Sequence, residues 1–140
     1  MTDIAVLQEA LADEHAVIYG YGVAGPRLQG ADRTAADAGF DAHRLRRERL
    51  AELVAEAGQT PVAPAAAYEL PFAVQSAVDA RRLIALLEAG IADRYFDLVR
   101  AAGTGERAES VDWLSESAAQ RARFDGGIAA FPGAPRPVIA

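Results

Sequence analysis

The chain has 140 residues, the usual length of one folded domain, and 51% of them are hydrophobic, so the sequence predicts a globular protein with a substantial core. It contains no cysteine, which excludes a disulfide framework, a thiolate metal site and a cysteine nucleophile. All 14 basic residues are arginine, and the net charge of −6 with a pI near 4.9 argues against a general nucleic-acid-binding protein.

The N-terminal segment carries early acidic residues and no basic stretch before an apolar run, which argues against a signal peptide. No run of about 18 uncharged apolar residues occurs, so we expect no transmembrane helix. We therefore expect a cytoplasmic protein with neither a membrane nor a nucleic-acid partner.

Helix-forming residues dominate the alanine-rich sequence, and glycine and proline divide it into four long helical stretches. The predicted helices span residues 3–28, 35–57, about 76–102 and 106–130, and either Ser76 or Asp79 could cap the third helix. Gly58 is suitably placed to end the second helix, and all four helices are long enough to cross a bundle.

The segment of about 58–75 contains three prolines and is predicted to be an extended crossover. If extended, it can travel the full length of the helices and make the second and third helices parallel. The sequence therefore predicts an all-α bundle of two helical hairpins joined by a long proline-rich crossover. The bundle is expected over residues 1–131, followed by a proline-rich tail at 132–140.

Two glutamates interrupt the apolar seams of the first and third predicted helices. Glu14 and Glu88 each lie between apolar or tyrosine residues one turn away, and a buried carboxylate without a partner costs several kcal/mol. On the facing seams, heptad spacing places His43 and Arg47 in the second helix and Arg121 in the fourth. We expect these side chains to converge in one polar core layer.

Aromatic residues flank that layer. Tyr21 and Tyr95 lie on the same seams as the glutamates and are expected to shield them and to satisfy them through their hydroxyls. His15 lies off the seam centre and is expected to be a half-buried surface residue. Two interpretations of Trp113 stay open, a dimer surface or packing under the crossover.

Several segments resemble an actinobacterial ferritin-like family of unknown function. They are EHAVIYGYG over residues 14–22, HRLRR over 43–47, Leu87-Glu88, and the crossover that ends in LPF at 70–72. The resemblance covers nearly the whole chain and implies a ferritin-like four-helix bundle that forms a homodimer. It implies no established activity.

Ferritin-like dimetal proteins bind metal with one Glu from each of two helices and a Glu-x-x-His pair from each of the other two. Glu14, Glu88 and His43 match three of these positions. Phe40 stands where the second helix would carry its Glu, and the predicted fourth helix has no histidine. Half of the ligand set is therefore missing.

The favoured hypothesis is a non-catalytic structural or interaction module without a cofactor. In it, the degenerate metal site is replaced by a buried network of Glu14 and Glu88 with Arg47, Arg121 and His43.

Two alternatives stay open. The first is a metal-dependent oxidase or peroxide-handling protein that holds iron or manganese at Glu14, His43 and Glu88. The second is a small-molecule binder with a pocket between the hairpins lined by Tyr21, Tyr95 and Phe72, the ligand being unknown.

Overall fold

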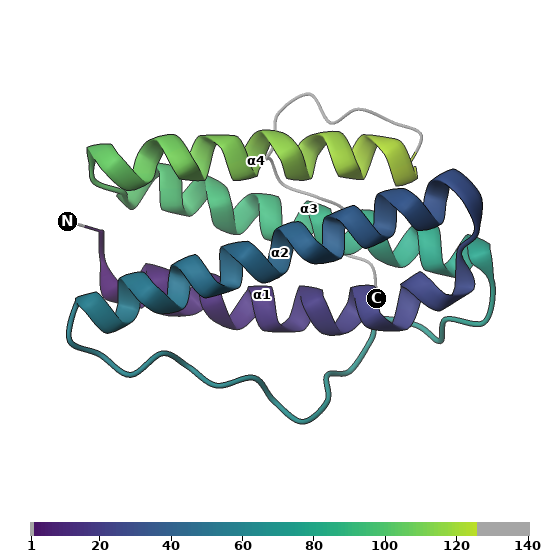
Figure 1. The fold of residues 1–140 in the computed structure, drawn as a ribbon, viewed down its shortest axis with the longest axis horizontal. Coiled ribbons are helices and arrows are strands. Elements are labelled where there is room, and N and C mark those ends of the chain that lie inside the picture. Colours follow the sequence, from purple (N-terminus) through teal and green to yellow (C-terminus); the bar gives the residue numbers. More distant parts are fainter. Residues whose placement is uncertain (1, 126–140) are drawn as a thin grey trace.

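The computed structural model describes residues 2–125. In chain order its elements are α1 (Ile4–Ala24), the short 3-10 helix η1 (Gly25–Arg27), α2 (Gly30–Glu56), α3 (Ala77–Ala101) and α4 (Thr104–Asp125). The predicted all-α bundle of two helical hairpins is confirmed (Figure 1). None of the helices in the described part of the chain is long and apolar enough to cross a membrane.

The connection between the hairpins sets the direction of the helices. Residues 57–76 contain no helix and return along the length of the bundle, so that α2 and α3 run parallel (Figure 1). Helix α1 packs against α2 and α3, and α3 packs against α4, whereas the fourth neighbouring pair, α2 and α4, is packed more loosely than these three. The helices therefore surround the core in the order α1, α2, α4, α3.

Local sequence signals explain where the helices begin and end. The Asp3 side chain caps α1 by accepting from the amide of Ala5 at 2.9 Å. Ser76 caps α3 by accepting from the amide of Asp79 at 3.1 Å. Helix α2 ends just before Gly58, whose φ of +85° is a backbone conformation that glycine adopts easily.

Two of the predicted boundaries differ from the structure by more than two residues. Helix α2 begins at Gly30, five residues before the predicted start at Ala35, and α1 ends at Ala24 because η1 takes over from Gly25. The predicted end of the fourth helix at residue 130 and the predicted tail at 132–140 lie outside the described residues.

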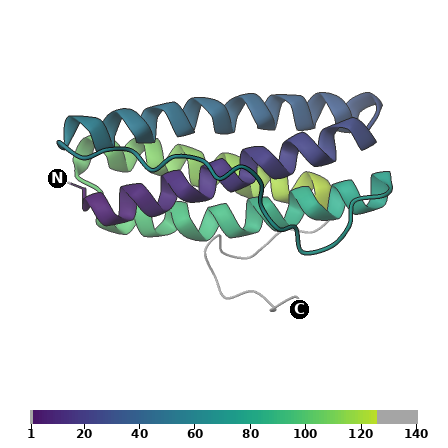
Figure 2. The same cartoon turned by 90° about the horizontal axis from the view of Figure 1, so that it is seen from below.

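The connection lies along α1 (Figure 2). The Gln8 side chain donates to the carbonyl of Thr60 at 2.7 Å and accepts from the amide of Val62 at 2.9 Å. The His15 ring donates through Nε2 to the carbonyl of Val62 at 2.9 Å. His15 is buried, so its prediction as a half-buried surface residue is wrong: the connection covers it.

The apolar core extends over most of the length of the bundle, and it includes Leu7, Leu11, Leu50, Val54, Leu83, Ile84, Ile91 and Leu98. The Leu87 side chain of α3 packs against α1 at Gly20, where an added Cβ would lie 2.5 Å from a methyl carbon of Leu87. The missing side chain at Gly20 therefore leaves the space that Leu87 fills.

Candidate functional site

A hydrogen-bonded polar layer crosses the middle of the core. His43 of α2 lies between Glu14 of α1 and Glu88 of α3, and all three side chains are almost completely buried. The His43 Nδ1 atom is 2.7 Å from Glu14 Oε2, and its Nε2 atom is 2.6 Å from Glu88 Oε1. Each ring nitrogen is thus engaged by a different carboxylate.

Two tyrosine hydroxyls also donate hydrogen bonds to the carboxylates. Tyr95 of α3 donates to Glu14 Oε1, and Tyr21 of α1 donates to Glu88 Oε1 at 2.6 Å. Each carboxylate thus receives one tyrosine hydroxyl and one imidazole N–H, and these hydrogen bonds offset part of the cost of its burial. The sequence predicts these five residues in one layer, and in the structure they lie together.

Helices α2 and α4 supply the outer members of the layer. Arg46 donates through Nη1 to the Tyr95 hydroxyl at 3.2 Å, and its other terminal nitrogen, Nη2, pairs with Glu116. Gln120 donates to the Tyr21 hydroxyl at 3.2 Å. Arg46 and Gln120 thus donate to the two tyrosine hydroxyls. The hydroxyls in turn donate to the two buried carboxylates.

The electrostatics support an imidazolium at the centre. Burial would lower the pKa of His43, but the carboxylates of Glu14 and Glu88 outweigh it and raise the pKa to about 9. Burial opposes ionisation of Glu88, yet its pKa is lowered because His43, Tyr21 and Ser117 stabilise the carboxylate. His43 is therefore positively charged at neutral pH.

The tyrosines remain neutral donors. Burial raises the pKa of Tyr21, and the neighbouring Glu88 raises it further. Burial also raises the pKa of Tyr95, with a further contribution from Glu14. Both hydroxyls therefore keep the protons that they donate to the carboxylates.

The prediction that Arg47 and Arg121 belong to the polar layer is wrong. Arg47 lies at the surface of α2, where its nearest ion-pair partner is Glu48 at 3.9 Å. Arg121 lies at the surface of α4 and pairs with Asp125 at 3.4 Å. The buried cation is Arg46, one position before Arg47, with a relative exposure of 5%.

Aromatic packing holds Arg46 and Tyr95 in place. The Arg46 guanidinium lies 5.4 Å from the centre of the Tyr95 ring, a cation–π contact. Trp113 packs on the same ring with centroids 5.7 Å apart. Trp113 therefore belongs to the α3–α4 interface, and neither interpretation drawn from the sequence places it there.

The residues of the layer do not fit the dimetal centre that a ferritin-like fold implies. Both nitrogens of His43 are already engaged by the two carboxylates that would share a metal with it. On α4, Ser117 and Gln120 face the layer, and neither can replace the missing Glu and His. Within residues 2–125, no three His, Asp or Glu side chains are grouped so that they could hold a metal ion.

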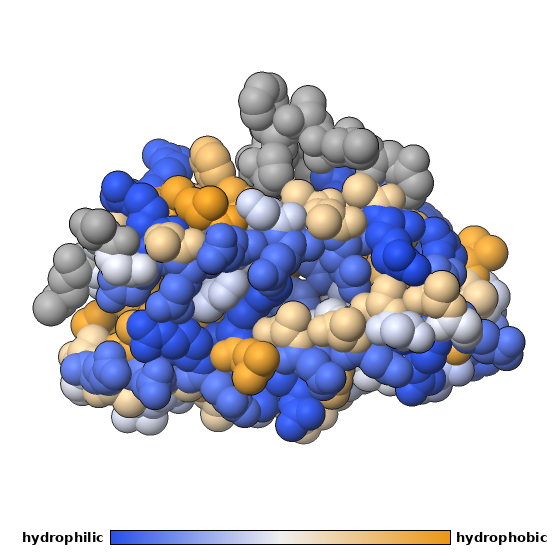
Figure 3. Space-filling model, turned by 45° about the horizontal axis from the view of Figure 1, so that its top comes forward, coloured by the Kyte–Doolittle hydropathy of each residue, from blue (hydrophilic) through white to orange (hydrophobic). Residues whose placement is uncertain are grey.

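A cavity of about 170 Å³ reaches the layer between α2 and α4. Its wall includes His43, Arg46, Glu88, Glu116 and Gln120. In Figure 3, which looks onto the face formed by α2 and α4, polar side chains dominate and a hollow opens near the centre. The cavity lies between the hairpins, as the small-molecule hypothesis expects, but its wall does not consist of Tyr21, Tyr95 and Phe72.

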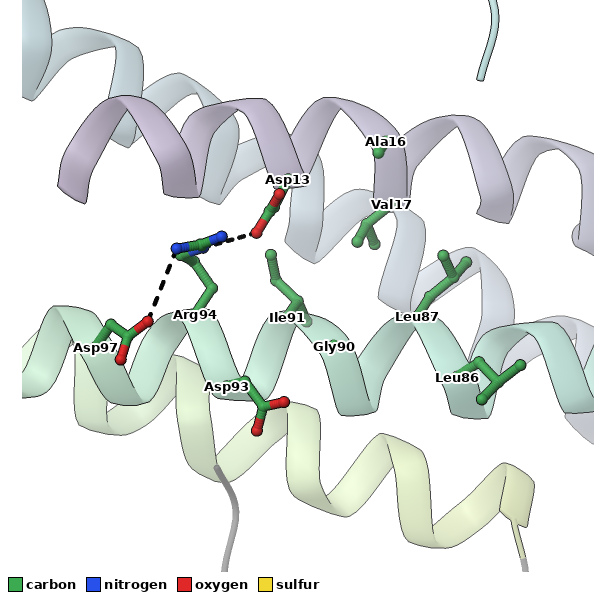
Figure 4. A pocket seen from close by; sticks show the side chains of 10 residues that line it. All are labelled: Asp13, Ala16, Val17, Leu86, Leu87, Gly90, Ile91, Asp93, Arg94 and Asp97. Carbon is green, nitrogen blue, oxygen red and sulfur yellow. Dashed lines mark hydrogen bonds and ion pairs between the residues drawn. The ribbon is translucent and has the colours of Figure 1, made fainter. Parts of the chain in front are cut away.

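A larger groove of about 480 Å³ lies on the opposite side of the bundle, between α1 and α3 (Figure 4). Arg94 crosses it and donates to Asp13 at 2.7 Å and to Glu9 at 2.8 Å. Apolar side chains that include Val17 and Ile91 line the groove beside these charges. None of the residues of the polar layer belongs to its wall, so the groove is separate from the layer.

Two solved structures are similar to the whole bundle. A crystal structure of a conserved hypothetical protein, rv2844, from Mycobacterium tuberculosis is 33% identical and has a TM-score of 0.83, over 87% of this chain and 93% of that chain. A crystal structure of ferritin-like, diiron-carboxylate proteins from Bacillus anthracis str. Ames is 18% identical and has a TM-score of 0.70, over 88% of this chain and 92% of that chain. The second likeness shows the fold alone, and it confirms the predicted ferritin-like architecture.

Comparison with protein families identifies the family of this chain. No curated protein matches the chain. The family model of a domain of unknown function, DUF4439, matches residues 6–136, which is almost the entire chain. The chain therefore belongs to the DUF4439 family.

Proposed function

We propose that this protein is a non-catalytic ferritin-like bundle that acts as a structural or interaction module, with an ionic hydrogen-bonded layer in place of a metal centre. The observation that carries the proposal is the position of His43 between Glu14 and Glu88. An imidazole with both nitrogens protonated has no lone pair to give to a metal.

The balance of charge supports the same proposal. The two carboxylates of Glu14 and Glu88 are matched by the imidazolium of His43 and the guanidinium of Arg46, so these four buried side chains are together neutral without a metal ion. A divalent cation placed there would have to displace His43 from at least one carboxylate. It would also meet the repulsion of the nearby Arg46.

The layer offers a structural role because it links all four helices. Glu14 belongs to α1, His43 to α2, Glu88 to α3 and Gln120 to α4. A one-residue shift of any helix would leave a buried charge or hydroxyl without its partner. The layer thus favours a single register of the helices, as buried polar residues do in other helical assemblies.

Metal binding tests the proposal. Protein expressed in a medium supplemented with iron, manganese and zinc is expected to contain far less than one metal ion per chain by elemental analysis. Anaerobic addition of Fe(II), Mn(II) or Zn(II) is expected to leave the Tm unchanged, because no ligand set is free to bind them.

The metal-dependent oxidase is the function that the opposite result would support. A stoichiometric metal ion that is lost in Glu14→Gln and retained in Glu9→Gln would contradict the non-catalytic proposal. Glu9 is a suitable control because it lies on the same helix and pairs with Arg94 at the surface.

We also propose that the protein forms a homodimer and that the segment 14–22 is a signature of the family. The segment supplies Glu14 and Tyr21 to the layer and Gly20 to the contact with α3. Exposed apolar side chains such as Leu45 and Phe96 provide surface for a second copy. Light scattering of the purified protein measures the oligomeric state, and a monomeric mass at micromolar concentration would contradict the dimer.

A further inference from the structure

The cavity between α2 and α4 is open to a ligand, but the hydrogen-bond donors in its wall are largely in use. Both ring nitrogens of His43 bind carboxylates. The side-chain nitrogen of Gln120 donates to the Tyr21 hydroxyl at 3.2 Å and to the carbonyl of Ala35 at 2.9 Å, so both of its hydrogens are engaged. A ligand that needs donors from the wall would therefore compete with the layer.

Acceptors, in contrast, remain available. Glu88 is 99% buried and belongs to the cavity wall; its Oε1 atom binds His43 and Tyr21, while its Oε2 atom has no hydrogen-bond partner within residues 2–125. Ser117 lies near this carboxylate and helps to lower its pKa. Glu116 adds a second carboxylate at the more exposed end of the wall, where it pairs with Arg46. An unpaired buried carboxylate oxygen calls for a donor.

The charges around the cavity determine the kind of donor. Three carboxylates belong to this group, Glu14, Glu88 and Glu116, and they face only two cations, His43 and Arg46. The group therefore carries one net negative charge, which a single positive charge would balance. A divalent metal ion fits poorly because the nitrogen ligands of His43 are already used.

We propose that this cavity is a binding site for a small organic ammonium compound. The ammonium group donates to Glu88 Oε2 and is attracted by Glu116, while the carbon atoms lie against Ala38 and Ala42 in the same wall. A volume of about 170 Å³ far exceeds the roughly 30 Å³ of one water molecule and accommodates several carbon atoms. This inference goes beyond the proposed structural role and does not depend on it.

Titration with propylammonium chloride, followed by backbone amide NMR, tests the site. A ligand this small is expected to bind in the millimolar range. We expect saturable shifts at the amides of Gly39, Ala42 and Gln120, beyond those caused by sodium chloride at the same ionic strength. Propanol, which is neutral, and acetate, which is negatively charged, are both expected to bind at least about tenfold more weakly than propylammonium, because neither carries a positive charge.

Three variants locate the site. Ala42→Leu fills the cavity and is expected to abolish the saturable shifts, with Ala38→Leu as a second way to fill it if the first variant fails to fold. Glu116→Gln is expected to weaken binding about tenfold. Glu109→Gln is the matched control, because Glu109 lies on the same helix and pairs with Arg49 of α2 outside the cavity.

Specific outcomes would overturn the proposal. If propylammonium caused no saturable shift in the wild-type protein, the cavity would hold water only. Equal binding to a folded Ala38→Leu or Ala42→Leu variant would place the ligand elsewhere. Equal effects of Glu116→Gln and Glu109→Gln, or equal affinity for propanol, would show that the charge of the cavity plays no part.

Discussion

At the residue scale, His43 decides the chemistry of the core. The same imidazole could be a metal ligand if one nitrogen were free, but here Glu14 and Glu88 engage both. The carboxylates of a dimetal site attract cations, and in this chain the cations are side chains of α2, His43 and Arg46. A ferritin-like core can thus remain electrically balanced while lacking half of its metal ligands.

The charge on His43 predicts a loss of stability at alkaline pH. Its pKa of about 9 in the folded state exceeds the ordinary 6.5, so the folded protein retains a proton that the unfolded chain releases. The resulting stabilisation, about 3 kcal/mol, is complete below pH 6.5 and is lost as the pH rises through 9. Urea unfolding across this range measures it.

The control for that measurement is His43→Gln. This variant is expected to be less stable throughout and to show a flat free energy of unfolding between pH 6.5 and 9, since the titrating group is gone. An undiminished slope in His43→Gln would assign the pH dependence to another group.

Substitution of two neighbouring arginines tests which face of α2 is buried. Arg46→Met is expected to lower the free energy of unfolding by about 2–4 kcal/mol, because it leaves Tyr95 and the buried carboxylates without their guanidinium. Arg47→Met removes only a surface charge and should change stability by less than about 0.5 kcal/mol. Thermal and urea unfolding compare them, and equal losses would refute this assignment.

The sequence allows some members of the layer to be identified and leaves others ambiguous. Glu14 and Glu88 are recognisable because they interrupt apolar seams, and His43 because it lies seven residues before Leu50. Between His43 and Leu50 the seam can pass through position 46 or 47. Both positions are arginine, so hydropathy cannot choose between them, and only the packed structure identifies Arg46.

At the element scale, the buried face of α4 lies one position away from the face that the apolar residues of its sequence predict. The buried positions are Ser110, Ser117 and Phe124, spaced seven residues apart. Two of them are serines, and Ser110 can be buried because its hydroxyl donates to the carbonyl of Glu106 at 2.8 Å. A seam read from apolar residues alone therefore moves by one position and turns Arg121 inward.

Helix α2 contains a position where only glycine fits. A Cβ at Gly39 would lie 2.6 Å from Gln120 Nε2 and 2.7 Å from the hydroxyl oxygen of Tyr21. Gln120 could move, but the Tyr21 hydroxyl is fixed by its bond to Glu88. Gly39→Ala is therefore expected to destabilise the protein by about 1–3 kcal/mol, even though alanine favours helix.

The matched control lies on α1. An added Cβ at Gly22 meets nothing within 4 Å, so Gly22→Ala should stabilise the protein by up to about 1 kcal/mol. Thermal unfolding of the two variants measures the difference, and a stabilising effect of Gly39→Ala would contradict the described packing of Tyr21.

At the scale of the whole molecule, the glycine and proline residues that interrupt the helical stretches suffice to predict two hairpins and a long connection. Gly58 and the prolines that follow it mark where α2 ends and the connection begins. The looser contact of α2 with α4 was not predictable, because it depends on how all four helices pack together. That looseness leaves the cavity beside Glu88.

We propose that the imidazolium ion of His43 occupies the position that a dimetal centre takes in ferritin-like proteins. The most direct test is the ¹⁵N NMR spectrum of the His43 ring at neutral pH, assigned with His43→Gln and recorded before and after addition of equimolar Zn(II). We expect both ring nitrogens to be protonated and their signals to be unchanged by zinc. A His43 nitrogen without a proton, or one that shifts to a metal-bound position when zinc is added, would contradict it.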